Sequence, residues 1–284
     1  MEAAYGDEGG DLVSLLIELG RAHLDPTKPA VAIGHFERAS SIVDKDQNVV
    51  LKGKKNFDIV SILLTRRASL HARPFIEASH AAYKQVLQAN DIRLGLAAYH
   101  MAIFALNDKR REDAINYFNE SLNAFEFNDG NLGDLERTVR TMLVDSLERI
   151  GKSEDATEHC LAIGERQEWR TPPRPLYMEP PVLDKSMAVE APTGRVVMSF
   201  TVDEQGFVRN SRVASSGAPG LNAAALAAMG QFRYAPRFEN SAAVATSNVN
   251  FIINYDFAGQ PAPGRKSNFK MPSSLGSKAG GGGK

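Results

Sequence analysis

The sequence predicts two folded parts of different class, an array of antiparallel helix pairs and a small α+β domain with the element order β-β-α-β. Three observations predict this division. Apolar residues recur at spacings of three and four through residues 11–168, as in helices that bury one face. Six of the 14 prolines then fall between Pro172 and Pro192. From Gly194 onward, apolar residues alternate with polar ones, which is the period of a strand.

Composition bounds the function classes. The 284 residues include 33 Lys plus Arg against 34 Asp plus Glu, and 43% are apolar. This excludes global disorder, predicts about two domains, and gives no support to a nucleic-acid binder. The apolar stretch from Leu12 to Leu19 is far shorter than the roughly 18–20 residues of a membrane span. The single cysteine, Cys160, excludes an intrachain disulfide and any metal site with two thiolates.

The helical part is expected to contain eight helices joined by short connectors. Asp25-Pro26 and Asn107-Asp108 are typical turn sequences, and Ser153 is a suitable N-cap. Gly151 lies where a helix ends before the last of the eight. The expected helices span residues 11–24, 29–44, 56–72, 74–89, 91–107, 111–126, 131–150 and 153–168.

The first helix pair resembles a tetratricopeptide repeat. Its apolar and small residues follow that spacing: Leu16, Leu19, Gly20, His23, Ala32, Phe36 and Ala39. Small side chains at Gly20 and Ala32 let two antiparallel helices approach closely, and Phe36 then fills the space towards the next pair.

The later pairs follow the spacing less well. The third is loose (Ala98, Met101, Ala102, Ala105, Ala114, Phe118, Ser121), and so is the fourth (Leu143, Val144, Leu147, Ala156, Cys160, Ile163). The second, with Tyr83 at the Phe position, fits poorly. A plain helical bundle is the alternative. The resemblance implies a protein-binding scaffold with a concave face, but no side chain here identifies a ligand.

The C-terminal part begins after a Pro-rich linker, residues 169–193, part of which is expected to pack on the next domain. Val196, Met198, Phe200 and Val202 alternate in a first strand, followed by a turn at Asp203–Gly206 and a second strand through Val213. An Ala-rich helix covers Leu221–Gly230. The last strand, 246–257, places Val249, Phe251, Ile253, Tyr255 and Phe257 on one face. The predicted domains are 11–168, 169–193 and 194–258, with a disordered basic tail at 259–284.

Residues 194–257 resemble the TonB C-terminal domain, the periplasmic end of the energy transducer of Gram-negative bacteria. The resemblance rests on residues in the family's order: Gly194, Val196, Val197, Phe200-Thr201-Val202-Asp203, Gly206, Val208, Ser215-Ser216-Gly217, Leu221, Ala224, Ala225, Leu226 and Phe232-Arg233-Tyr234-Ala235-Pro236. Pro180-Pro181 departs from the Tyr-Pro pair that the family often has there. From their residue types, Phe232 and Tyr234 are expected in the core and Arg233 on a solvated strand.

The resemblance implies binding by strand addition, in which an extended segment of an outer-membrane receptor pairs with an exposed sheet edge. By resemblance, the edge is placed at Ser247, Asn248, Val249, Asn250, Phe251, Ile252 and Ile253, with Arg233 and Tyr234 as further contacts. The expected partner is a TonB-dependent receptor or another envelope protein, and the expected location is the periplasm.

Two departures bear on a transducer role. The chain has no N-terminal membrane helix to engage inner-membrane motor proteins, and a helical array stands where the family has a long Pro-rich spacer. Met1–Gly10 has neither the basic nor the apolar region of a signal peptide, so either the protein is cytosolic or a targeting segment lies outside this chain. The resemblance to the TonB C-terminal domain favours the second expectation. The protein is then either an anchored transducer or a soluble periplasmic adaptor.

A second hypothesis is structural: the β module dimerises or caps the array, and the array scaffolds an envelope complex. No catalytic residue is predicted, because the six histidines are scattered and no phosphate loop or Gly-x-Ser-x-Gly elbow occurs. A cell-wall hydrolase is therefore a weak third hypothesis. Cys160 is expected to be buried and inert. The sequence predicts a protein that is not an enzyme, with no cofactor, no metal and no nucleic-acid partner.

Overall fold

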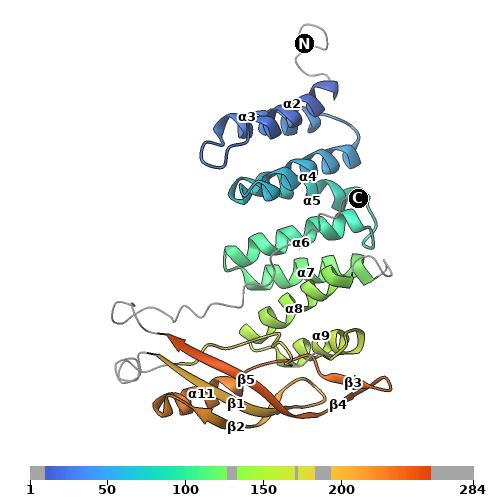
Figure 1. Ribbon diagram of the computed structural model, residues 1–284. Helices are drawn as coiled ribbons and strands as arrows, with labels where there is room; N and C mark the ends of the chain where they lie inside the picture. Colours follow the sequence, from blue (N-terminus) through green and yellow to red (C-terminus); the bar gives the residue numbers. More distant parts are fainter. Residues whose placement is uncertain (1–9, 127–132, 170–171, 183–192, 257–284) are drawn as a thin grey trace, which may run out of the picture. The chain divides into compact units, whose positions relative to one another are not determined.

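The computed structural model describes residues 10–126, 133–169, 172–182 and 193–256 (Figure 1). Its contacts divide the chain into two compact units, Met1–His159 and Cys160–Lys284. The division falls inside the helix Ser153–Arg166. The sequence instead places the domain boundaries at 168 and 194, and these boundaries stay predictions. Each unit is described by itself below.

The first unit is built from helices that follow one another as antiparallel pairs, as predicted (Figure 1). Helix α2 packs on α3, α4 on α5 and α6 on α7. The assignment to the tetratricopeptide class stays a prediction. The helices are α2 (Gly10–His23), α3 (Ala30–Val43), α4 (Val49–Thr65), α5 (Arg73–Val86), α6 (Ile92–Asn107), α7 (Arg111–Glu126), α8 (Gly133–Arg149) and α9 (Ser153–Arg166), with a short 3₁₀ helix at Ser69–His71.

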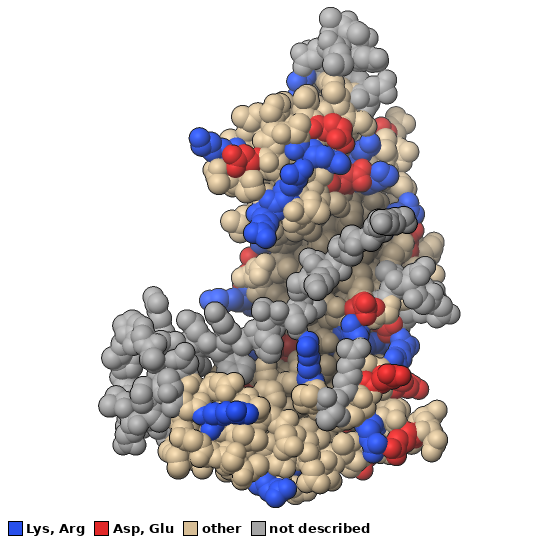
Figure 2. Space-filling view, viewed as in Figure 1, with Lys and Arg blue, Asp and Glu red and all other residues tan. Residues whose placement is uncertain are grey.

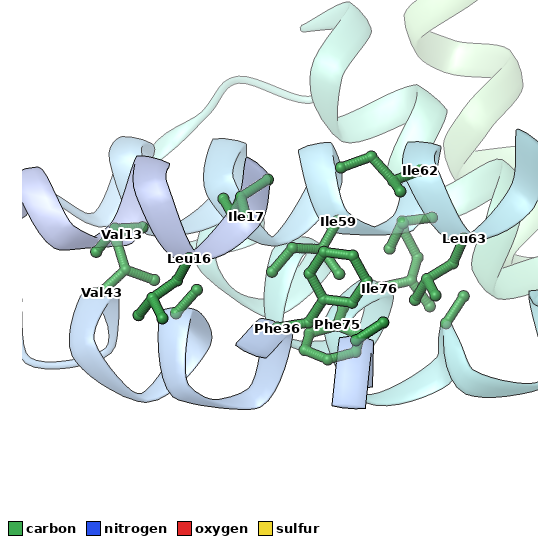
Figure 3. Packing of buried hydrophobic residues seen from close by; sticks show 14 of the residues in the cluster. Val13, Leu16, Ile17, Phe36, Val43, Ile59, Ile62, Leu63, Phe75 and Ile76 are labelled. Carbon is green, nitrogen blue, oxygen red and sulfur yellow. The ribbon is translucent and has the colours of Figure 1, made fainter. Parts of the chain in front are cut away.

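The close approach predicted for the first pair is confirmed. A Cβ atom added to Gly20 would lie 2.3 Å from the Phe36 ring, so only glycine fits there without displacing that ring. Phe36 is fully buried and meets the edge of Phe75 from α5, with ring centroids 6.3 Å apart (Figure 3). Phe36 therefore joins the first pair to the second, as its spacing predicts.

The predicted start and end of the third helix, 56 and 72, are wrong. Helix α4 begins at Val49, because the Asn48 side chain caps it by accepting a hydrogen bond from the Leu51 N–H at 3.0 Å. With this start, Gly53 faces Tyr83, whose ring would lie 2.4 Å from an added Cβ. The second pair thus repeats the glycine–aromatic contact of the first.

The second unit contains the predicted β-β-α-β module. Its three-stranded antiparallel sheet has the order β2-β1-β5, and helix α11 (Asn222–Met229) lies across it. The strands are β1 (Thr193–Val202), β2 (Val208–Ser216) and β5 (Thr246–Asp256). A small hairpin, β3 (Arg237–Glu239) and β4 (Ala242–Val244), was not predicted. It turns at Asn240 and Ser241, which both have positive φ.

One face of the sheet forms the core of the second unit. The alternation predicted for β1 and β5 is confirmed, since Val196, Met198, Val249 and Ile253 are all buried. Ala225 and Ala228 of α11 pack on this face, together with the half-buried Trp169. Phe257, predicted on the same face, lies outside the described residues.

Candidate functional site

The candidate site is the outer edge of β5. In the sheet order β2-β1-β5, β1 is central and β5 is a terminal strand. Within the described residues, no strand pairs with the outer side of β5, and no loop backbone hydrogen-bonds to it. Alternate residues of such an edge present N–H and C=O groups that a further strand can pair with.

The two edges of the sheet differ in regularity. The pairing of β2 with β1 shifts register twice, at Val197/Met198 and between Ser199 and Thr201. The pairing of β5 with β1 shifts once, between Phe200 and Val202. From Val249 to Asp256 its register is unbroken. Because bulges interrupt pairing, β5 offers the longer regular edge.

The bulge divides the predicted peptide-binding residues into two groups. Ser247 and Asn248 lie opposite the register shift, and Asn248 has a φ of 57°. Residues Val249 to Ile253 lie in the regular part. Asparagine tolerates this left-handed backbone better than most residues, which explains its presence at the bulge.

Side chains on the regular part of β5 alternate between two environments. Val249 and Ile253 are buried, and Phe251 stands edge-on to Phe232 with ring centroids 5.4 Å apart. Asn250 and Ile252 point to the opposite, outer face of the sheet and are exposed. With 41% of its surface exposed, Ile252 is one of the few large apolar residues left open to solvent.

The prediction that Arg233 is a solvated strand residue is wrong, because only 1% of its surface is exposed. Its guanidinium carbon lies 3.7 Å from the centre of the Phe207 ring, and Nη2 donates a hydrogen bond to the Gln205 carbonyl at 3.0 Å. An aromatic face and a backbone carbonyl replace water around the cation. Arg233 thereby holds the hairpin turn against the core.

Tyr234 is fully buried, as predicted for a core residue, and so is Phe232. Burial raises the pKa of the Tyr234 hydroxyl above its ordinary value. The roles of Arg233 and Tyr234 as contacts of a bound segment stay predictions, which the burial of both side chains does not favour.

Part of the Pro-rich segment packs on the second unit, as expected. The Leu176 N–H donates to the Arg233 carbonyl at 2.7 Å, and the Arg233 N–H donates to the Tyr177 carbonyl at 3.1 Å. Residues of this segment therefore pair like a short strand with the residues after α11. The buried Tyr177 side chain fixes the segment in place.

The end of α9 also belongs to the second unit, which the sequence did not indicate. Cys160 is fully buried, as predicted, and its Sγ accepts a 3.6 Å hydrogen bond from Arg233. Further along the helix, a Cβ on Gly164 would lie 2.4 Å from the Pro236 carbonyl oxygen. The glycine lets the helix touch the backbone before β3.

The helical unit has a groove of 550 Å³ between α2 and α4. Its charged residues are of both signs, as Figure 2 shows for this part of the surface, and several are paired within the groove wall. Arg21 lies 3.4 Å from Glu18, and Lys55 donates to the Ser14 hydroxyl at 2.8 Å. With Arg21, Lys55 and Arg66 against Glu18 and Asp58, the groove has nearly balanced charges that would not select a ligand.

Two further features bear on function. Among the residues that the structure describes, no group of three or more His, Cys, Asp or Glu side chains is placed to hold a metal ion. None of the described helices combines the length and the apolar character needed to cross a membrane.

Comparison with known proteins supports the resemblance seen in the sequence. Residues 188–257 match the family described as Gram-negative bacterial TonB protein C-terminal. No curated protein matches the chain. The match covers β1 to β5 and α11. The chain therefore carries a TonB C-terminal domain at residues 188–257, behind an array of antiparallel helix pairs.

Proposed function

We propose that the second unit binds an extended segment of an outer-membrane receptor by adding it as a strand beside β5, in TonB-dependent transport. The observation that carries this proposal is the regular edge from Val249 to Asp256, with which no other described strand pairs. Strand addition needs such a row of open backbone groups, because main-chain hydrogen bonds supply the affinity.

The binding residues that we propose are those of the predicted edge, but the bulge divides them into residues that pair directly and residues that end the paired stretch. Val249, Asn250, Phe251, Ile252 and Ile253 would pair directly, and Ser247 and Asn248 would mark the end of the paired stretch. The left-handed Asn248 bends the strand, so a segment paired from Tyr255 towards Val249 would separate from β5 there.

We further propose that the protein is a linker between envelope proteins. The β5 edge would hold one partner, and the helical array would hold another, in the manner of helical-repeat scaffolds. An inner-membrane motor could act on the bound receptor segment if an anchor precedes residue 1 in the native protein.

A peptide titration tests the strand addition. A peptide from the periplasm-facing N-terminal segment of a TonB-dependent receptor is added to the full chain while amide chemical shifts are recorded. We expect shift changes concentrated in residues 249–255. Absence of changes there, with peptide in excess, contradicts the proposal.

A matched pair of variants sharpens this test. Ile252→Lys places a charge in the middle of the proposed site, on a side chain that is 41% exposed. Val182→Lys introduces the same charge at an 87% exposed position of the same unit that is not part of a strand. We expect only Ile252→Lys to weaken peptide binding. Equal effects of the two variants would mean that binding lies elsewhere.

The same edge could pair with a second copy of the chain, as in the structural hypothesis. If the edge serves only dimerisation and no receptor segment binds, analytical ultracentrifugation would show a dimer that Ile252→Lys dissociates and that added receptor peptide leaves intact. A dimer that dissociates as the peptide binds would instead show that both use the edge.

A further inference from the structure

The outer face of the sheet, opposite the core, has a definite chemical pattern. Three rows of outward side chains cross it in register. One row joins Arg212, Ser199 and Asn250, the next joins Ser215, Val197 and Ile252, and a third joins Arg195 and Asn254. The two outer rows therefore each begin with an arginine, and the row between them is apolar at its β1 and β5 positions.

The two arginines have no acidic partner among the side chains that the structure describes. In the part of the chain that the structure describes, neither Arg195 nor Arg212 forms an ion pair, whereas the neighbouring Arg209 is held by Asp203 at 2.8 Å. Arg212 makes only long contacts to neutral groups, 3.4 Å to Ser199 Oγ and 3.5 Å to Asn248 Oδ1. The stretches 195–201, 208–216 and 248–254 contain no acid, and the acids that follow the first and the last of them in the sequence are Asp203 after β1 and Asp256 at the end of β5.

The surface view agrees with this pattern. In Figure 2, the visible acidic atoms of the second unit lie towards α9 and the β3–β4 hairpin. Basic atoms are visible over other parts of the second unit, apart from these acidic atoms. The positive charge on this face is therefore left for a partner to balance.

We propose that the segment added beside β5 carries a carboxylate, an apolar residue and a second carboxylate at alternate positions of its outer face. This inference rests on the proposed strand addition. The first carboxylate would lie beside Asn250 and reach Arg212, the apolar residue would lie beside Ile252, and the second carboxylate would reach Arg195 past Asn254. The pattern reads the same in both directions, so it holds for a parallel or an antiparallel segment.

The distances allow these contacts. Neighbouring strands lie about 4.8 Å apart, so the added strand would be about 10 Å from β1, within the combined reach of an arginine and a glutamate. Arg212 starts one strand further away, but its guanidinium already extends across β1 to Asn248 on β5. An outer-face glutamate beside Asn250 would therefore find the cation at the edge.

Three labelled extended peptides test the inference on the full chain by fluorescence anisotropy. They share their inner-face residues and carry Glu-Val-Glu, Gln-Val-Gln or Lys-Val-Lys on the outer face. We expect the Glu peptide to bind about threefold to tenfold more tightly than the Gln peptide, and the Lys peptide to bind most weakly. The differences should shrink as salt is raised, because exposed charges are screened.

Charge reversal on the protein completes the test. Arg195→Glu with Arg212→Glu should invert the order, so that the Lys peptide binds best, whereas Lys28→Glu on the helical unit should leave the order unchanged. Equal binding of all three peptides to the unaltered chain overturns the charge pattern and leaves strand addition standing. If none binds and no shift changes occur along 249–255, strand addition itself is wrong and this inference falls with it.

Discussion

The contact between Gly53 and Tyr83 makes a sharp prediction about the helical unit. Replacing a helix-interior glycine by alanine ordinarily stabilises a protein by about 0.5–1 kcal/mol, because alanine loses less backbone entropy on folding. At Gly53 the added methyl would lie 2.4 Å from the buried Tyr83 ring, and overpacking of this kind costs about 1–3 kcal/mol. We therefore expect Gly53→Ala to lower the free energy of unfolding by up to about 2 kcal/mol.

Gly34 is the matched control. It lies inside α3, and nothing lies within 4 Å of a Cβ added there. Gly34→Ala should therefore stabilise the unit. Far-UV circular dichroism during thermal unfolding reports mainly on this unit, which holds most of the helices. One kcal/mol corresponds to about 2–4 °C in Tm for a unit of this size, so the two variants should shift the midpoint in opposite directions.

A double variant separates the steric clash from other causes. Tyr83→Leu alone should destabilise the unit by loss of buried surface, but combining it with Gly53→Ala should cost less than the sum of the two single changes. Strict additivity, or a Gly53→Ala chain as stable as the Gly34→Ala chain, would refute the glycine–aromatic contact and the corrected start of α4 with it.

Three further predictions concern single residues. Arg233→Gln should lower the unfolding midpoint of the second unit, because the contacts of the guanidinium with the Phe207 ring and the Gln205 carbonyl are lost. The fluorescence of Trp169, the only tryptophan in the sequence, reports this unfolding. Asn48→Ala should cost the helical unit about 1 kcal/mol in urea unfolding, the usual price of a lost N-cap. Desolvation lowers the pKa of His100 from 6.5 to about 4, so the unfolded chain binds this proton at a higher pH than the folded chain does. The free energy of unfolding should therefore fall between pH 6.5 and pH 4, by no more than about 3 kcal/mol. His100→Leu should flatten that part of the pH profile.

The regular features of both units could be predicted from the sequence because they depend on local periods. Strand alternation in β1 and β5 follows directly from the pattern of apolar residues. The packing of Phe36 on Gly20 follows from a known spacing. The sequence does not predict the corresponding contact of Gly53 with Tyr83 in the second pair, because the start of α4 lies in a Lys-rich stretch that hides the apolar period. The Asn48 cap was the one local signal of that start.

The features that could not be predicted depend on contacts between distant residues. A charged residue in a strand is expected to be exposed, yet Arg233 is buried because Phe207 and Gln205, far away in the sequence, surround its guanidinium. The β3–β4 hairpin turns at Asn240 and Ser241, without the glycine that marks most such turns. The bulge at Asn248 likewise depends on pairing with β1, and it decides how much of the candidate edge is usable.

The features that keep an edge strand from pairing with other chains are present on β2 and nearly absent from β5. Proteins commonly guard an exposed edge with bulges, prolines or charged side chains. Strand β2 has two register shifts, a left-handed Asn210 and two arginines. Strand β5 has one shift near its start, and from Val249 to Tyr255 it contains no proline and no charged residue. An edge left open in this way would favour aggregation unless a partner covers it, and three asparagines on its outer face can pair with polar groups of such a partner. The contrast between the two edges of one sheet is thus the strongest reason to place binding at β5 and not at β2.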